Sequence, residues 1–82
     1  MITIVYHVRP RSSHPAQATY PTQVMPRHHD RVLRQWADHV RREFGASTTR
    51  ETAWRRLPDG SYEVWKRQKP GGLHLATLTL TP

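Results

Sequence analysis

The chain has 82 residues, which is enough for one domain with a thin hydrophobic core and too few for two. It contains no cysteine, so disulfide bonds and thiolate-bound zinc are excluded, and the core must consist of aliphatic and aromatic side chains. With 13 Lys and Arg against 6 Asp and Glu, the formal net charge is +7, a balance that favours nucleic acid or acidic protein surfaces as partners.

The first predicted element is a strand over residues 2–8. Its apolar side holds Ile2, Ile4, Tyr6 and Val8, an alternation typical of a strand that is buried on one face. This apolar run is too short to span a membrane and lacks the basic start and cleavage site of a secretory signal. We therefore expect a cytoplasmic protein without a membrane segment.

Residues 10–25 are predicted to form a long proline-rich loop. The segment contains Pro10, Pro15 and Pro21 and shows neither helical nor strand periodicity. A structureless connection of this length is uncommon inside a compact domain and is usually functional or disordered.

The clearest predicted element is a helix over residues 27–44. Asp30 lies in its first turn, where a carboxylate favours the helix dipole, and Gly45 is the kind of residue that ends a helix. Apolar side chains recur at helical spacing and form one stripe, with Val32 at its edge: Leu33, Trp36, Ala37, Val40 and Phe44. We expect this stripe to pack against the core.

The segment TAWRRLPDGSYEVWKR predicts a β-hairpin with a type I turn and a glycine bulge. In the corresponding register, Leu57 lies opposite Ser61, Arg55 opposite Glu63 and Trp54 opposite Val64. The core face then holds Trp54, Tyr62 and Val64, and the other face holds Arg55, Glu63, Trp65 and Arg67. A slip of one residue would exchange the two faces.

The final segment, LHLATLTLTP, predicts a last strand. Its apolar alternation changes phase near Leu75 and Ala76, which indicates a bulge or a strand buried on both faces. The predicted fold is therefore a single small α+β domain over residues 1–82, in the order β-α-β-β-β. It consists of an antiparallel sheet of about four strands with one helix on one face.

The outer face of the predicted helix is the first candidate binding surface. Five arginines fall within an arc of about 100° opposite the apolar stripe, namely Arg27, Arg31, Arg34, Arg41 and Arg42. Asp38 lies in the same arc at a spacing that allows ion pairs with Arg34 and Arg42, and Asp30 is spaced to reach Arg34. The face is therefore either a self-paired, solvated surface or a contact surface for phosphates.

The open face of the predicted sheet is the second candidate. Trp65 stands there beside Arg55 and Arg67, and His7 and Arg9 lie on the outward side of the first strand. Such groups stack on unpaired bases or anchor a protein interface. The alternative is that the long 10–25 loop folds over Trp65 and buries it in a second small core.

The loop that follows the hairpin is the third candidate, because it combines Lys66, Arg67 and Lys69 with Gly71 and Gly72. It lacks the spacing of a P-loop or of a dinucleotide-binding fingerprint, and it precedes a strand instead of a helix. We therefore interpret it as the basic tip of a loop. Over all three surfaces, the predicted binding residues are Arg31, Arg34, Arg41, Arg42, Arg55, Trp65, Arg67 and Lys69.

We expect no cofactor, no metal and no catalytic activity. His28 and His39 are about 16 Å apart along a helix, too far for one ion. Asp59, Glu63 and Lys66 only loosely match a metal-dependent nuclease signature, because Glu63 and Lys66 point to opposite faces of one strand. No sequence resembling a nucleophile elbow is present.

The chain resembles small stand-alone proteins of phages and mobile elements, of which anti-CRISPR inhibitors are one group. The resemblance covers its size, its α+β character without motifs and a first strand that starts at Met1. The resemblance shares no motif, so it assigns no site residue. It implies an inhibitor that acts in the host cytoplasm. Many such inhibitors are acidic and mimic DNA, whereas this chain is basic and would have to dock on acidic protein surfaces or on nucleic acid.

Two functional hypotheses follow. In the first, the protein is a non-enzymatic inhibitor or modulator that docks on a larger nucleic-acid-handling protein or ribonucleoprotein complex through Arg and Trp side chains. In the second, it is an accessory or regulatory protein that binds nucleic acid directly. The sequence leaves open the identity of the partner and the oligomeric state.

Overall fold

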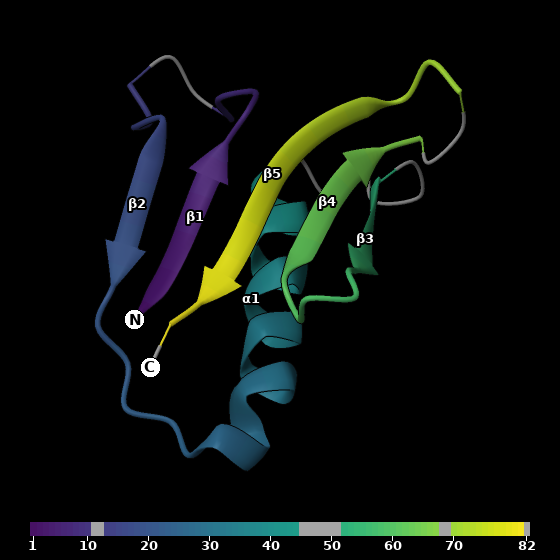
Figure 1. The fold of residues 1–82 in the computed structure, drawn as a ribbon. Helices are drawn as coiled ribbons and strands as arrows, with labels where there is room; N and C mark the ends of the chain where they lie inside the picture. Colours follow the sequence, from purple (N-terminus) through teal and green to yellow (C-terminus); the bar gives the residue numbers. More distant parts are fainter. Residues whose placement is uncertain (11–12, 45–51, 68–69, 82) are drawn as a thin grey trace.

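The computed structural model describes residues 1–10, 13–44, 52–67 and 70–81, and it confirms the α+β fold. A five-stranded antiparallel sheet carries one helix on one face (Figure 1). In chain order the elements are β1 (Ile2–Tyr6), β2 (Gln17–Tyr20), the 3-10 helix η1 (Pro26–His28), α1 (His29–Glu43), β3 (Thr52–Arg56), β4 (Tyr62–Lys66) and β5 (Leu73–Leu80). The strand order across the sheet is β2-β1-β5-β4-β3.

The sequence prediction was wrong for part of residues 10–25, because the segment expected to be a loop contains strand β2. The order is therefore β-β-α-β-β-β, with five strands instead of about four. β2 pairs with β1 so that Ala18 lies opposite Ile4 and Tyr20 opposite Ile2. Its four residues are only half-buried at alternate positions. A short edge strand of this kind leaves too little apolar alternation in the sequence to be recognised.

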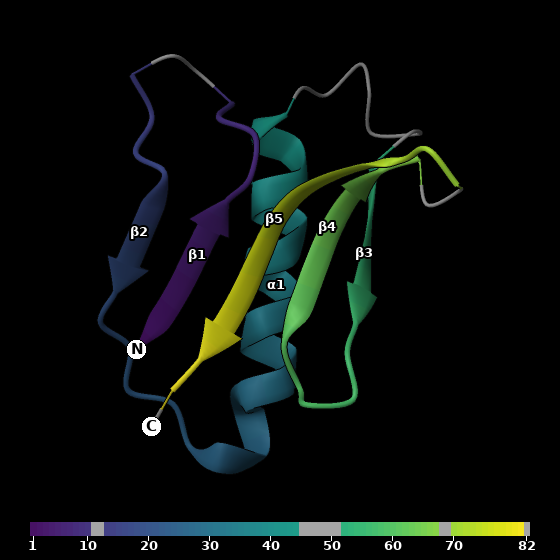
Figure 2. The ribbon, with the colours of Figure 1, turned by 45° about the horizontal axis from the view of Figure 1, so that its top comes forward.

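The centre of the sheet is the pairing between the first and the last strand. β1 and β5 run antiparallel, with Ile4 opposite Leu78 and Thr3 opposite Thr79. The α-amino group of Met1 donates a hydrogen bond of 2.7 Å to the carbonyl oxygen of Thr81. The two ends of the chain therefore lie side by side at one edge of the fold (Figure 2).

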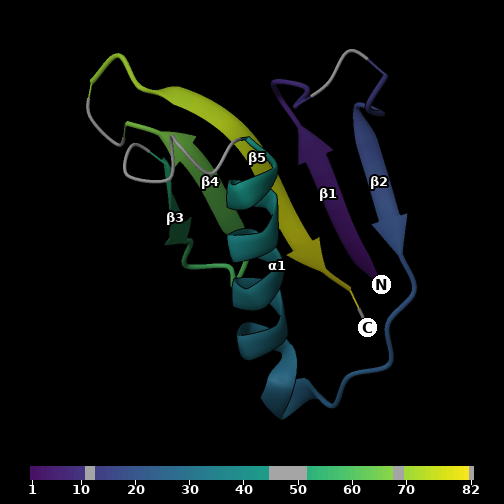
Figure 3. The same cartoon turned by 180° about the vertical axis from the view of Figure 1, so that it is seen from behind.

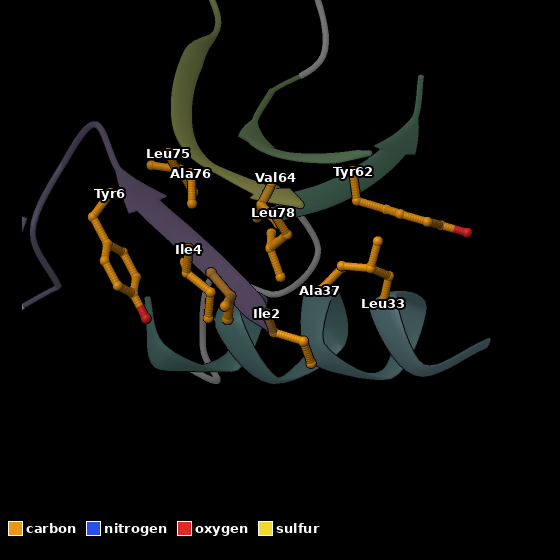
Figure 4. Packing of buried hydrophobic residues seen from close by; sticks show 11 residues of the cluster. Ile2, Ile4, Tyr6, Leu33, Ala37, Tyr62, Val64, Leu75, Ala76 and Leu78 are labelled. Carbon is orange, nitrogen blue, oxygen red and sulfur yellow. The ribbon is translucent and has the colours of Figure 1, made fainter. Parts of the chain in front are cut away.

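The hydrophobic core lies between α1 and one face of the sheet. Leu33, Ala37 and Val40 of the predicted stripe are buried, and Val32, Trp36 and Phe44 pack against them at the margin. Seen from behind, α1 lies across β5 and β4 (Figure 3), while Figure 4 shows its side chains meeting those of the strands. Gly45, the predicted end of the helix, lies outside the described residues; α1 itself ends at Glu43.

The register of the β3–β4 hairpin is the predicted one. Trp54 lies opposite Val64 and Arg55 opposite Glu63. At the turn, Gly60 N–H donates to the carbonyl oxygen of Leu57 at 3.0 Å, and Leu57 N–H donates to that of Ser61 at 2.8 Å.

The predicted bulge is also present, in β5. Val64 pairs with Ala76 whereas the next residue, Trp65, pairs with His74, so Leu75 is the extra residue. Its carbonyl oxygen accepts hydrogen bonds from the backbone N–H groups of His7 and Val8. The bulge turns His74 to the helix-free face while keeping Leu75 and Ala76 buried.

Gly60 supplies the first test of this fold. Its φ is +90°, a conformation that side chains with a Cβ rarely adopt, although no atom crowds the position. We expect Gly60→Ala to lower the free energy of unfolding by about 1 kcal/mol. Gly60→Asn should lose less, since Asn tolerates left-handed backbone better. Urea unfolding followed by circular dichroism measures both, and equal stability of the Ala variant and the parent would contradict the turn geometry.

Candidate functional site

Asp30, near the start of α1, is held by groups from the β3–β4 hairpin. Its Oδ1 accepts a hydrogen bond of 2.8 Å from the hydroxyl of Tyr62 and lies 3.0 Å from Nε of Arg56. Burial, the hydrogen bond to Asp30 and the charge of that carboxylate raise the pKa of Tyr62. Asp30 therefore pairs with Arg56, which is far away in the sequence, and not with Arg34 as expected.

Asp38 pairs with Arg41, with 3.5 Å between Oδ1 and Nη2. The prediction that it would pair with Arg34 and Arg42 was wrong, because the carboxylate turns toward the residue three positions further along the helix. Arg31, Arg34 and Arg42 are exposed, and no ion pair holds any of them within the part of the chain that the structure describes.

The other described carboxylates are engaged as well. Glu43 accepts a hydrogen bond of 2.8 Å from Tyr6 and lies 3.1 Å from Nε2 of His39. Burial and this carboxylate raise the pKa of Tyr6. Asp59 accepts from the N–H and the hydroxyl of Ser61, and this keeps its pKa low. No described carboxylate is therefore left to pair with Arg31, Arg34 and Arg42 of α1.

We define the arginine face as Arg31, Arg34 and Arg42, on the side of α1 away from the core stripe, together with Arg27 of the preceding η1. Arg41 lies at its margin, half-buried beside Asp38. Tyr62 and Arg56 both contact Oδ1 of Asp30, and the charges of Arg56 and Arg34 oppose the rise in the pKa of Tyr62. The arginine face thus borders strand β3.

The open face is the helix-free side of the sheet, which none of the described elements covers (Figure 1). Here three rings form a row, which we call the ring stack. His7, directly after β1, and His74 of β5 have ring centroids 4.3 Å apart with planes tilted by 34°, and His74 and Trp65 of β4 lie 4.6 Å apart with planes only 6° from parallel. Ala53 of β3 occupies the position opposite Trp65.

A polar network lies beside this stack. Nε2 of His74 is 3.1 Å from the carbonyl oxygen of Ala76, 3.2 Å from Oγ1 of Thr77 and 3.3 Å from Oε2 of Glu63. Because a carbonyl and a carboxylate oxygen both face this nitrogen, it must carry the proton. The other carboxylate oxygen of Glu63, Oε1, is 2.7 Å from Nη2 of Arg55.

The network does not form a catalytic triad. In a triad, the two nitrogens of one imidazole serve the acid and the nucleophile separately. Here Glu63 and Thr77 both face Nε2 of His74. This side chain therefore cannot pass a proton from Thr77 toward Glu63 through its ring.

Two pKa shifts follow from the same contacts. Burial and the charge of His7 lower the pKa of His74 below 6.5, against the opposing charge of Glu63. Burial acts to raise the pKa of Glu63, but the hydrogen bond from Arg55 and the charges of His74 and Arg55 outweigh it, and the pKa lies below 4.5. The network therefore favours a carboxylate beside a neutral imidazole.

The predicted site residues that the structure describes lie mainly in two regions, the open face and the outer side of α1. Arg55 and Trp65 lie on the open face as expected; Arg67 follows β4 in a left-handed conformation with φ of +63°. Lys69 lies outside the described residues. The predicted alternative in which residues 10–25 cover Trp65 is wrong, because β2 pairs at the opposite edge of the sheet.

Sequence reasoning missed His74 and Thr77 as partners of Glu63 and Trp65. The phase change at Leu75 and Ala76 was the available signal, since a bulge there decides to which face His74 points. The pairing of β1 with β5, which places His7 beside Thr77 at 2.9 Å, has no signal in either strand alone.

A polar pocket of about 330 Å³ lies between the start of α1, the β3–β4 turn and the end of β5. Asp30, Arg56, Asp59 and Ser61 line it, and they are already paired with one another or with Tyr62. No cluster of three metal-ligating side chains exists among the described residues. The open face and the arginine face therefore remain the candidate surfaces.

The network on the open face predicts opposite effects of two substitutions on the pKa of His74. Glu63→Gln should lower it further, because the carboxylate favours the imidazolium, and His7→Gln should raise it, because His7 opposes that charge. Since the folded pKa lies below the ordinary value, the contribution of His74 to stability is lost as the pH falls through it. An NMR pH titration of the ring protons measures each pKa; the same value in all three proteins would contradict the network.

Within the described residues, no helix is long and apolar enough to cross a membrane. Comparison with protein-family models, with curated proteins and with solved structures finds no match to this chain.

Proposed function

We propose that this protein is a non-enzymatic binding protein that contacts the phosphates of nucleic acid through the arginine face of α1. The observation that carries the proposal is the pairing of charges. All five carboxylates in the described ranges have partners, whereas Arg31, Arg34 and Arg42 stand exposed without an ion pair on one side of one helix. A positive surface of this kind attracts a polyanion.

The spacing of the arginine face supports a partner with repeated charges. At 1.5 Å per residue, Arg31 and Arg34 lie roughly 4.5 Å apart along the axis of α1, and Arg42 lies about 12 Å further on. A regular helix thus presents guanidinium groups in a row. Phosphates along a nucleic-acid strand offer acceptors at regular intervals, and each guanidinium is able to bind one in a bidentate manner.

The distribution of apolar side chains favours nucleic acid over a protein surface. Interface hot spots usually require clustered aromatic anchors. Here the three tryptophans do not cluster, because Trp36 lies against Tyr20, Trp54 against Tyr62 and Trp65 against His74 on the open face. The most exposed large apolar residues are Met1, Val5, Met25 and Leu73, which are spread along the chain. Docking of an anti-CRISPR-type inhibitor on a larger complex stays a prediction that no observation here tests.

The proposal is tested by replacing Arg31, Arg34 and Arg42 with Gln. We expect the triple variant to bind duplex DNA more weakly and its affinity to depend less steeply on salt. The log–log slope should fall by about 0.9 for each phosphate that the variant no longer neutralises. Fluorescence anisotropy of a labelled duplex at several salt concentrations measures both quantities.

The matched control replaces the same three residues with Lys. This variant keeps the positive charge, so its affinity should depend on salt with the same log–log slope as that of the parent. Circular dichroism should show both variants folded, because the three side chains are exposed. An unchanged slope in the Gln variant would reject the arginine face as the binding surface. The absence of binding by the parent protein at low salt would reject the function and favour a protein partner.

A further inference from the structure

Among the described residues, the ring stack on the open face ends at Trp65. The rings follow one another from His7, at the end of β1, to His74 of β5 and Trp65 of β4. Strands in a sheet lie about 4.8 Å apart, close to the separation of stacked rings. The next position in this row belongs to Ala53 on the edge strand β3. The side chain of Ala53 is a methyl group, and no ring of the described residues occupies this position beside the indole.

Charged groups connect this position with the arginine face. Successive side chains of β3 point to opposite sides of the sheet. Arg56 therefore lies on the helix side, paired with Asp30, and Arg55 lies on the open face, paired with Glu63. The two side chains are 61 % and 59 % exposed. Each guanidinium group is paired with a carboxylate, so the two pairs add no net charge, but their exposed side chains line the free edge of the sheet between α1 and Trp65.

From these observations we infer that the preferred ligand is single-stranded nucleic acid. Its phosphates follow the arginine face and the β3 edge, and one unpaired base stacks on Trp65 above Ala53. This inference rests on the proposed function. A duplex contacts the arginine face alone, because its bases are already stacked on one another and cannot reach the indole.

Filling the position above Ala53 tests the inference. We expect Ala53→Leu to weaken binding of labelled oligothymidylate about 5- to 150-fold, the range for removing one base–aromatic stack, and to leave binding of a labelled duplex unchanged. Ala53→Ser, which keeps the space open, should bind both ligands like the parent. Thermal unfolding of each variant shows whether the edge strand stays intact.

A second measurement follows Trp65 itself. Oligothymidylate should quench the tryptophan fluorescence of the parent protein, and most of the quenching should disappear in Trp65→Phe, because Trp36 and Trp54 lie on the helix side of the sheet. The Phe ring still offers a stacking surface, so anisotropy should show affinity within a few-fold of the parent value.

The outcomes separate this inference from the function on which it rests. If Ala53→Leu binds oligothymidylate as tightly as Ala53→Ser, while both ligands still bind through the arginine face, base stacking is rejected and the proposed function stands. If the parent binds neither nucleic acid, both fail. Binding of polyglutamate in place of both nucleic acids would identify an acidic protein surface as the occupant and overturn the inference.

Discussion

The antiparallel pairing of β1 with β5 is the interaction on which the rest of the structure depends. It joins the N-terminal hairpin, which otherwise contains only two strands, to the meander of β3, β4 and β5. Neither part has enough apolar surface to be stable alone, and the joined sheet provides a face wide enough to cover α1. The pairing links residues from opposite ends of the chain, so its entropic cost must be offset by burial of side chains such as Ile2, Ile4 and Leu78.

A domain of this size with one helix on one sheet leaves two large polar surfaces. The core uses a single face of the sheet and a single stripe of the helix, so the open face and the outer side of α1 have no structural partner among the described elements. On the open face, stacked rings and a hydrogen-bonded carboxylate replace apolar packing. On α1, the exposed arginines contribute little to stability, because even paired surface charges are worth about 0–1 kcal/mol. Their side chains are therefore available to a ligand.

The positions of the carboxylates give these surfaces their different character. Asp30 and Glu63 draw Arg56 and Arg55 to the two sides of the same edge strand. Because Asp30 is occupied by the hairpin and Asp38 by Arg41, the middle of the arginine face keeps its full positive charge. Net charge alone does not determine such a surface; it arises because tertiary contacts select which cations are neutralised.

The sequence determined the elements whose signals are local. The 3.6-residue period of Leu33, Ala37 and Val40, the turn chemistry around Gly60 and the phase change at Leu75 each predicted what the structure contains. β2 had no such signal, because a short edge strand buries little of its own surface. Asp38 pairs with Arg41 within one turn of the helix, and the predicted hairpin register already placed Arg55 opposite Glu63. The partners of Asp30, the contact of Glu63 with His74, and the stack of His7, His74 and Trp65 were decided by the tertiary structure alone. They depend on which strands become neighbours and on the register between them, and these are set by the summed burial of the whole sheet rather than by any one segment.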